Sequence, residues 1–134
     1  GAARAIDASE ARKLIGKELG GVDACLVFSA RMAGFELGLK VLRPAGLFVA
    51  VGIPPSSEGN IPLNPWEFFL KGPTIVYSAV GNVQDMRELV ALAGAGRVKS
   101  HIGRVGDLAD LGDIFDELEA GKYVGRAVIN VAQD

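Results

Sequence analysis

Three short apolar runs constrain the fold of this chain more than any other feature. They occupy residues 22–28, 47–51 and 74–80, and each begins directly after a glycine or a Gly-Pro pair. The first two lack the polar alternation of a half-exposed strand, so we expect them to be covered on both faces. Longer amphipathic stretches separate the runs, and this alternation predicts an α/β fold with a parallel sheet in which residues 22–28 form a central strand.

Capping residues mark four of the expected helices. Asp7, Asn64, Asn82 and Asp107 each lie directly before a stretch with helical patterning. Short polar side chains at such positions accept hydrogen bonds from the first free amides of a helix. Gly121 is expected to end the last of these helices, because glycine readily adopts the left-handed conformation found there.

Shorter patterns complete the expected order of elements. Apolar residues at helical spacing predict a helix between residues 32 and 43. Residues 3–6 are interpreted as a short strand, residues 98–105 as a strand that contains His101, and residues 127–131 as a terminal strand. Together with the helices that follow Asn82 and Asp107, these strands predict αβαβ order for the C-terminal part.

Composition and charge exclude several classes of function. The 134 residues include 14 basic and 16 acidic side chains, and this balance argues against nucleic acid or an anionic membrane as the main partner. No apolar run approaches the roughly 18 residues of a membrane span, and we expect no leader segment. The single Cys25 excludes an intrachain disulfide, which predicts a reducing, cytoplasmic location. Cys25 and His101 alone cannot form a zinc site with three or four such ligands.

Candidate ligand-binding residues lie where the three apolar runs end. Ligands of open parallel sheets bind outside the carboxyl ends of the strands. Glycine at two of these ends would allow the backbone to approach a planar ligand closely. The three ends are Phe28-Ser29-Ala30-Arg31, Val51-Gly52-Ile53 and Ser78-Ala79-Val80-Gly81. Together they indicate a flat cofactor lying across the strand ends, whereas each one taken singly is also consistent with an ordinary turn.

The glycine fingerprint of a dinucleotide-binding fold is missing from this sequence. The only G-x-G, at Gly94 and Gly96, follows an expected helix, whereas the fingerprint follows a strand. Asp7 is interpreted as a helix cap in preference to a carboxylate for a ribose.

Three further side chains belong to types that bind ligands or react in many proteins. Arg126 opens the terminal strand, where it is either a surface arginine or a bidentate clamp for a phosphate. His101 is interpreted as a structural or surface histidine. Cys25 lies inside the most apolar run, so we interpret it as a core residue and not as a nucleophile.

Four stretches carry a resemblance to a known family. They are Gly20-Gly21-Val22-Asp23, residues 42–54, residues 70–81 and residues 119–128. In this order they resemble the C-terminal part of a zinc-containing, medium-chain alcohol dehydrogenase. Ala45 and Tyr77 depart from the pattern, because the family generally has glycine at both positions. The zinc ligands, the glycine fingerprint and the ribose acid of such enzymes belong to a preceding region.

The resemblance implies a partial doubly wound, Rossmann-like parallel sheet and a map of its cofactor site. Residues 1–81 would be the C-terminal portion of the NAD(P)-binding domain, and residues 82–134 would pack on the catalytic domain of the parent enzyme. The matched cofactor-binding residues are Phe28, Ser29, Ala30 and Arg31 beside the adenosine, Val51, Gly52 and Ile53 along the nicotinamide, Ser78, Ala79 and Val80 at the carboxamide, and Arg126 at the pyrophosphate.

The resemblance also implies an activity. The chain would be part of an oxidoreductase that transfers hydride between an alcohol or carbonyl substrate and NAD or NADP, with zinc held by the preceding region. We assign no catalytic or metal-binding residue here and expect the chain alone to be inactive. Residues 74–80 would form an edge strand that pairs in a homo-oligomer. Two alternatives stay open, namely a non-catalytic, self-associating α/β module and a fragment of a zinc-free quinone reductase relative.

Overall fold

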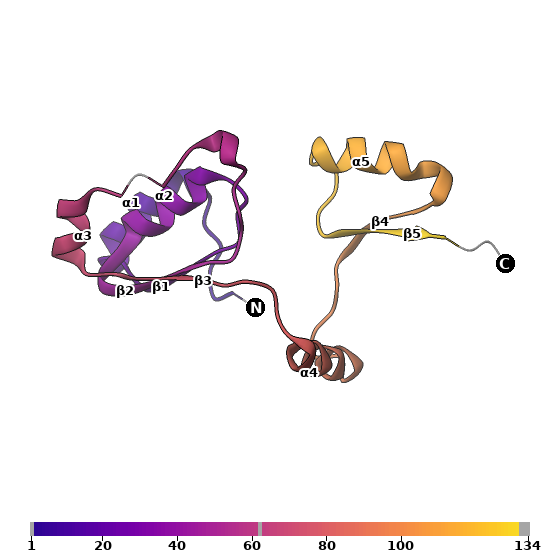
Figure 1. Ribbon diagram of the computed structural model, residues 1–134, viewed down its shortest axis with the longest axis horizontal. Helices are drawn as coiled ribbons and strands as arrows, with labels where there is room; N and C mark the ends of the chain where they lie inside the picture. Colours follow the sequence, from indigo (N-terminus) through magenta and orange to yellow (C-terminus); the bar gives the residue numbers. More distant parts are fainter. Residues whose placement is uncertain (1, 62, 132–134) are drawn as a thin grey trace. The chain divides into compact units, whose positions relative to one another are not determined.

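The computed structural model describes residues 2–61 and 63–131, and it confirms an α/β fold with parallel sheets (Figure 1). The chain divides into two compact units, Gly1–Val80 and Gly81–Asp134, which are described separately below.

The first unit is a three-stranded parallel sheet with three α-helices. Its strands have the order β1-β2-β3. The register pairs Leu26 with Val49 and Val49 with Val76. Its elements are α1 (Ala8–Leu19), β1 (Val22–Val27), α2 (Met32–Val41), β2 (Leu42–Ala50), the 3₁₀ helix η1 (Ser56–Glu58), α3 (Pro65–Lys71) and β3 (Thr74–Tyr77).

Local capping explains where the helices of this unit begin and end. The Asp7 carboxylate accepts a hydrogen bond from the Ser9 amide at 2.9 Å, and Gly20 ends α1 in the left-handed conformation. The Asn64 side chain accepts from the Trp66 amide at 3.0 Å, directly before Pro65 at the first helical position. The predicted caps at Asp7 and Asn64 are therefore confirmed.

The core of the first unit lies on one face of the sheet. The buried side chains of Phe35 on α2 and Phe48 on β2 have ring centroids 5.8 Å apart, and Phe68 on α3 packs against the same cluster. Figure 1 shows the helices of this unit gathered over one side of its strands. Burial of these rings removes a large apolar area from water and so stabilises this unit.

The expectation that residues 22–28 form a central strand covered on both faces is wrong. In the sheet order β2 is central and β1 lies at one end. Leu26 and Val76, which face away from the core, are 57% and 43% exposed. The strand is apolar on both faces, but the described helices of this unit cover only one face of the sheet.

Three shorter predictions are corrected as well. Residues 3–6 form no strand, His101 lies just before a strand, and β3 ends at Tyr77. The chain passes from α2 directly into β2 at Leu42, and Ala45 inside this strand has a positive φ of 58°. The change from helix to strand therefore comes earlier in the chain than Pro44 and Gly46, where the sequence predicts it.

The second unit has the predicted αβαβ order. It contains α4 (Val83–Gly94), β4 (Ile102–Asp107), the 3₁₀ helix η2 (Leu108–Asp110), α5 (Leu111–Glu119) and β5 (Arg126–Asn130), with β4 and β5 parallel. Asn82 and Asp85 form a capping box on α4, and Gly121 follows α5 with a φ of 64°. The predicted caps at Asn82 and Gly121 are confirmed. Asp107 caps η2, so α5 itself begins later, at Leu111.

Candidate functional site

The carboxyl ends of the three strands in the first unit meet through backbone hydrogen bonds. The amides of Val51 and Gly52 both donate to the Val27 carbonyl, at 2.9 and 2.8 Å. The Ser78 amide donates to the Ala50 carbonyl at 2.8 Å. The structure therefore brings together the three strand ends of this unit to which the sequence assigns cofactor contacts.

Gly52 lies in a position that no other residue can take without movement of the backbone. A Cβ atom at this position would lie 2.2 Å from the Ser29 carbonyl oxygen and 2.8 Å from the Phe28 carbonyl carbon. Contacts this short against main-chain atoms cannot be relieved by rotation of a side chain. Glycine at this position thus allows the ends of β1 and β2 to approach each other closely. The sequence predicted a close approach here as well, but to a planar ligand.

Arg31 lies beside an acidic partner from a distant part of the chain. Its guanidinium Nη1 is 2.9 Å from Glu58 Oε1, and the Met32 amide at the start of α2 donates to Glu58 Oε2 at 2.6 Å. The amide hydrogen bond and the Arg31 guanidinium lower the pKa of Glu58 from its ordinary value of 4.5. The Ser29 hydroxyl oxygen accepts from the Arg31 amide at 3.1 Å and so shapes the turn after β1.

Sequence reasoning did not find Glu58. The contact with Arg31 spans 27 residues, and nothing in the spacing of the polar loop at residues 56–60 singles out this carboxylate.

Apolar and unpaired groups remain accessible at the strand ends. Ile53 is 84% exposed and Val80 is 97% exposed. Among the described residues, the backbone of Ala79 and Val80 makes no hydrogen bond with another backbone group. Exposed apolar side chains beside free amides and carbonyls suit a planar, polar ring such as a nicotinamide.

Tyr77 changes the surroundings of this end of the sheet. It lines an open cavity of about 400 Å³ together with Gly52, Ile53, Met32 and Phe35. Tyr77 lies where the family that the chain resembles generally has glycine. Its ring therefore occupies space beside Gly52 and Ile53, the two residues matched to the nicotinamide.

Arg126 belongs to the second unit. It is exposed, it opens β5, and its amide donates to the His101 carbonyl at 2.9 Å. The assignment of Arg126 to a pyrophosphate stays a prediction, as do the roles of the strand-end residues in the first unit.

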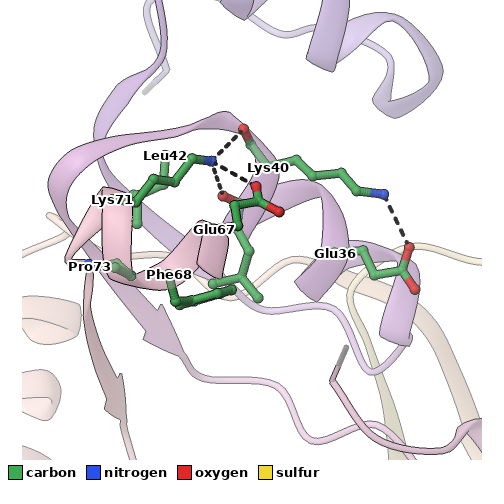
Figure 2. Close-up of a pocket in the computed structure, with 8 residues that line it drawn as sticks. Glu36, Lys40, Leu42, Glu67, Phe68, Lys71 and Pro73 are labelled. Carbon is green, nitrogen blue, oxygen red and sulfur yellow. Dashed lines mark hydrogen bonds and ion pairs between the residues drawn. The ribbon is translucent and has the colours of Figure 1, made fainter. Parts of the chain in front are cut away.

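A smaller cavity lies away from the strand ends and has a structural explanation (Figure 2). It has a volume of about 50 Å³ and lies between α2 and α3. The Lys71 ammonium donates to the Leu39 and Lys40 carbonyls at 3.3 and 3.5 Å and is 3.4 Å from Glu67. A cation that satisfies carbonyls at the C-terminus of a helix stabilises that helix, so we assign Lys71 to capping α2.

Metal-binding residues do not gather in the part of the chain that the structure describes. No group of three His, Cys, Asp or Glu side chains there could hold a metal ion. Cys25 is half-buried, burial raises its pKa, and His101 lies in the other unit. These residues do not fit a zinc ion, so we derive no step that depends on one.

Among residues 2–61 and 63–131, none of the helices is both long and apolar enough to span a bilayer.

Parallel strands with helices packed on them and carboxyl ends that meet at one edge define a Rossmann-like α/β protein. Residues 1–95 match the family model described as zinc-binding dehydrogenase, and the chain belongs to this family. The resemblance inferred from the four matching stretches is thereby confirmed.

Similar proteins carry the name alcohol dehydrogenase. One from Geobacillus stearothermophilus is 35% identical over 91% of this chain and 35% of its own length, and one from Moraxella sp. is 36% identical over 85% and 32%. The crystal structure of an alcohol dehydrogenase from Aeropyrum pernix superposes with a TM-score of 0.86 at 25% identity, covering 98% of this chain and 38% of that one. The chain thus spans about a third of the length of the relatives it matches.

Proposed function

We propose that this chain supplies part of the nicotinamide cofactor site of an alcohol dehydrogenase. The complete enzyme would transfer hydride between an alcohol or carbonyl substrate and NAD or NADP. A nicotinamide cofactor supplies the hydride acceptor or donor, and the protein orients the reacting ring and excludes competing reactions.

The observation that carries this proposal is the meeting of three strand ends in the first unit. The Val27 carbonyl accepts from both Val51 and Gly52, and Gly52 lies against the backbone of Ser29. This contact joins the residues expected beside the adenosine to those expected along the nicotinamide. Because the junction is made of main-chain atoms, it gives a rigid floor on which a flat cofactor can lie.

Each candidate residue has a proposed contact with the cofactor. Arg31 would contact a phosphate or ribose oxygen, since its guanidinium is largely exposed and carries several free donors. Ile53 would pack against the nicotinamide ring, and the free backbone groups at Ala79 and Val80 would bind its carboxamide. Arg126 would contact the pyrophosphate. These contacts bind and orient the cofactor but transfer no proton.

The remaining features of the proposal concern the complete enzyme. Residues 1–81 would belong to its cofactor domain and residues 82–134 would pack on its catalytic domain, where the zinc ligands would lie. Residues 74–80 would pair across a homo-oligomer, because β3 lies at one end of the described sheet and leaves backbone groups unpaired. A cytoplasmic location belongs to the same proposal.

Calorimetric titration with NADH and NADPH tests the proposal directly. We expect the 134-residue chain to bind at least one of them, and to bind it more weakly after Arg31→Ala. Arg12→Ala on α1 is the matched control, because it removes an exposed arginine from the same unit and should leave binding unchanged. Absence of binding by the folded chain contradicts the proposal. Turnover of an alcohol by this chain would contradict the expectation that it is inactive alone.

A further inference from the structure

We infer that Glu58 is a positioning residue for the cofactor site, since its carboxylate holds the Arg31 guanidinium and the loop after β2 together at the start of α2. The inference rests on the proposed function, because it concerns the contact that Arg31 would make with the cofactor.

The Glu58 carboxylate contacts two groups that belong to one turn of the chain. Its Oε1 is 2.9 Å from Arg31 Nη1, and its Oε2 accepts from the Met32 amide at 2.6 Å. Both oxygens are therefore used, and each contact is a charge-assisted hydrogen bond or an ion pair. A side chain held at two points has far less freedom than one held at a single point.

The arrangement leaves most of the Arg31 guanidinium available. Its side chain is 79% exposed, whereas that of Glu58 is 23% exposed. A guanidinium has five N–H donors, and among the described residues the Arg31 side chain donates only from Nη1. Glu58 thus fixes one nitrogen, and the remaining nitrogens can still donate to an anionic or hydroxyl group of a cofactor.

The position of Glu58 in the chain connects two parts of the proposed site. It lies on η1, which follows Val51, Gly52 and Ile53 through two prolines at 54 and 55. Proline restricts the backbone, so a constraint at Glu58 limits the movement of this loop. Groups whose positions are set before binding lose less entropy when the ligand arrives.

NADH titration of a double-mutant cycle distinguishes positioning from a general structural role. We expect Glu58→Ala to weaken NADH binding about 3- to 10-fold, the size expected for the net loss of one typical hydrogen bond. In an Arg31→Ala background Glu58→Ala should weaken binding by clearly less, because only the contact with the Met32 amide then remains to be lost. Glu58→Asp should restore part of the affinity in the presence of Arg31. Glu18→Ala is the matched control, because Glu18 pairs with Arg4 in the same unit.

Each outcome of this experiment has a definite meaning. Equal or tighter binding by Glu58→Ala overturns the inference, and tighter binding would show that the carboxylate competes with the cofactor. A loss of the same size in the Arg31→Ala background also overturns it, because the role would then be structural. If the wild-type chain binds NADPH in place of NADH, the same cycle is run with NADPH. Failure of the folded wild-type chain to bind either cofactor overturns the proposed function and the inference with it. Circular dichroism of every variant separates these results from loss of folding.

Discussion

The two units of this chain have similar local patterns but very different cores. The first unit buries a cluster of apolar side chains that includes Phe35, Leu39 and Phe48. Among the described residues of the second unit, Ile114 is the one buried apolar side chain, at 3% exposure. Both units have parallel strands and correctly capped helices. Correct local patterning is therefore not sufficient to build a core.

The difference lies in what covers the apolar faces. In the first unit α2 and α3 pack on the sheet, whereas in the second unit α5 contacts β4 and the apolar face of α4 stays exposed. Met86 and Val90 on that helix are 60% and 62% exposed. An amphipathic helix is stabilised mainly by burial of its apolar face. The second unit should therefore gain much more stability than the first from any surface that covers it.

The largest expected effect tests whether the two cores are independent. Phe48→Ala should destabilise the first unit by about 3–5 kcal/mol, since it removes a fully buried ring. Trp66, the single tryptophan, lies on α3 and reports on this unit during urea unfolding. Ile114→Ala should leave the fluorescence transition of Trp66 unchanged.

Two results would contradict this comparison. A shift of the Trp66 transition by Ile114→Ala would show that the units unfold together. An unchanged transition in Phe48→Ala would show that its ring contributes little. Val76→Ala, on the exposed face of the same sheet, is the control for loss of an apolar side chain without loss of core.

The next effect concerns the junction at Gly52. Gly52→Ala should cost about 1–3 kcal/mol, because its Cβ would meet main-chain atoms of Ser29 that cannot rotate away. Gly16→Ala is the control, since nothing lies near that position in α1 and alanine favours a helix. The urea midpoint monitored at Trp66 should therefore fall in Gly52→Ala and rise in Gly16→Ala. A stable Gly52→Ala variant would show that the strand ends are loosely joined.

Ala45 offers a gain in stability to the first unit. The positive φ angles in the second unit all belong to glycine among the described residues, whereas Ala45 in the first has a φ of 58°. Ala45→Gly should stabilise by about 1 kcal/mol, because it relieves the strain of a left-handed alanine. Gly46→Ala should destabilise, since its Cβ would lie 2.7 Å from Leu42 Cγ. Thermal unfolding monitored by circular dichroism measures both changes, and a lower melting temperature for Ala45→Gly would contradict the strain.

The smallest effect is the dependence of the first unit on pH. The folded-state pKa of Glu58 lies below its ordinary value of 4.5, so its contribution to stability is present above that pH and is lost as the pH falls through the folded pKa. Glu58→Gln should therefore destabilise slightly at neutral pH and have no effect in strong acid. Urea midpoints at the two pH values measure this, and an equal difference in acid would exclude the carboxylate charge as the cause.

Much of the candidate site was predictable because its residues follow strands. The ends at Phe28–Arg31, Val51–Ile53 and Ser78–Val80 can be found by locating the apolar runs, and parallel strands place such ends at one edge. The contact between Glu58 and Arg31 was not predictable, because the two residues lie far apart in the sequence. The choice of ligand for Arg126 also depends on neighbours that the sequence does not identify.

The sequence by itself determined where several helices of this protein begin. The caps at Asp7, Asn64 and Asn82 act over two or three residues, so their chemistry can be recognised without a fold. Only the tertiary structure decided that β2 is the central strand, that one face of the sheet carries the core, and that Gly52 lies against Ser29. The physical reason is that these features depend on contacts between distant segments, whose formation balances burial against the entropy of closing long loops.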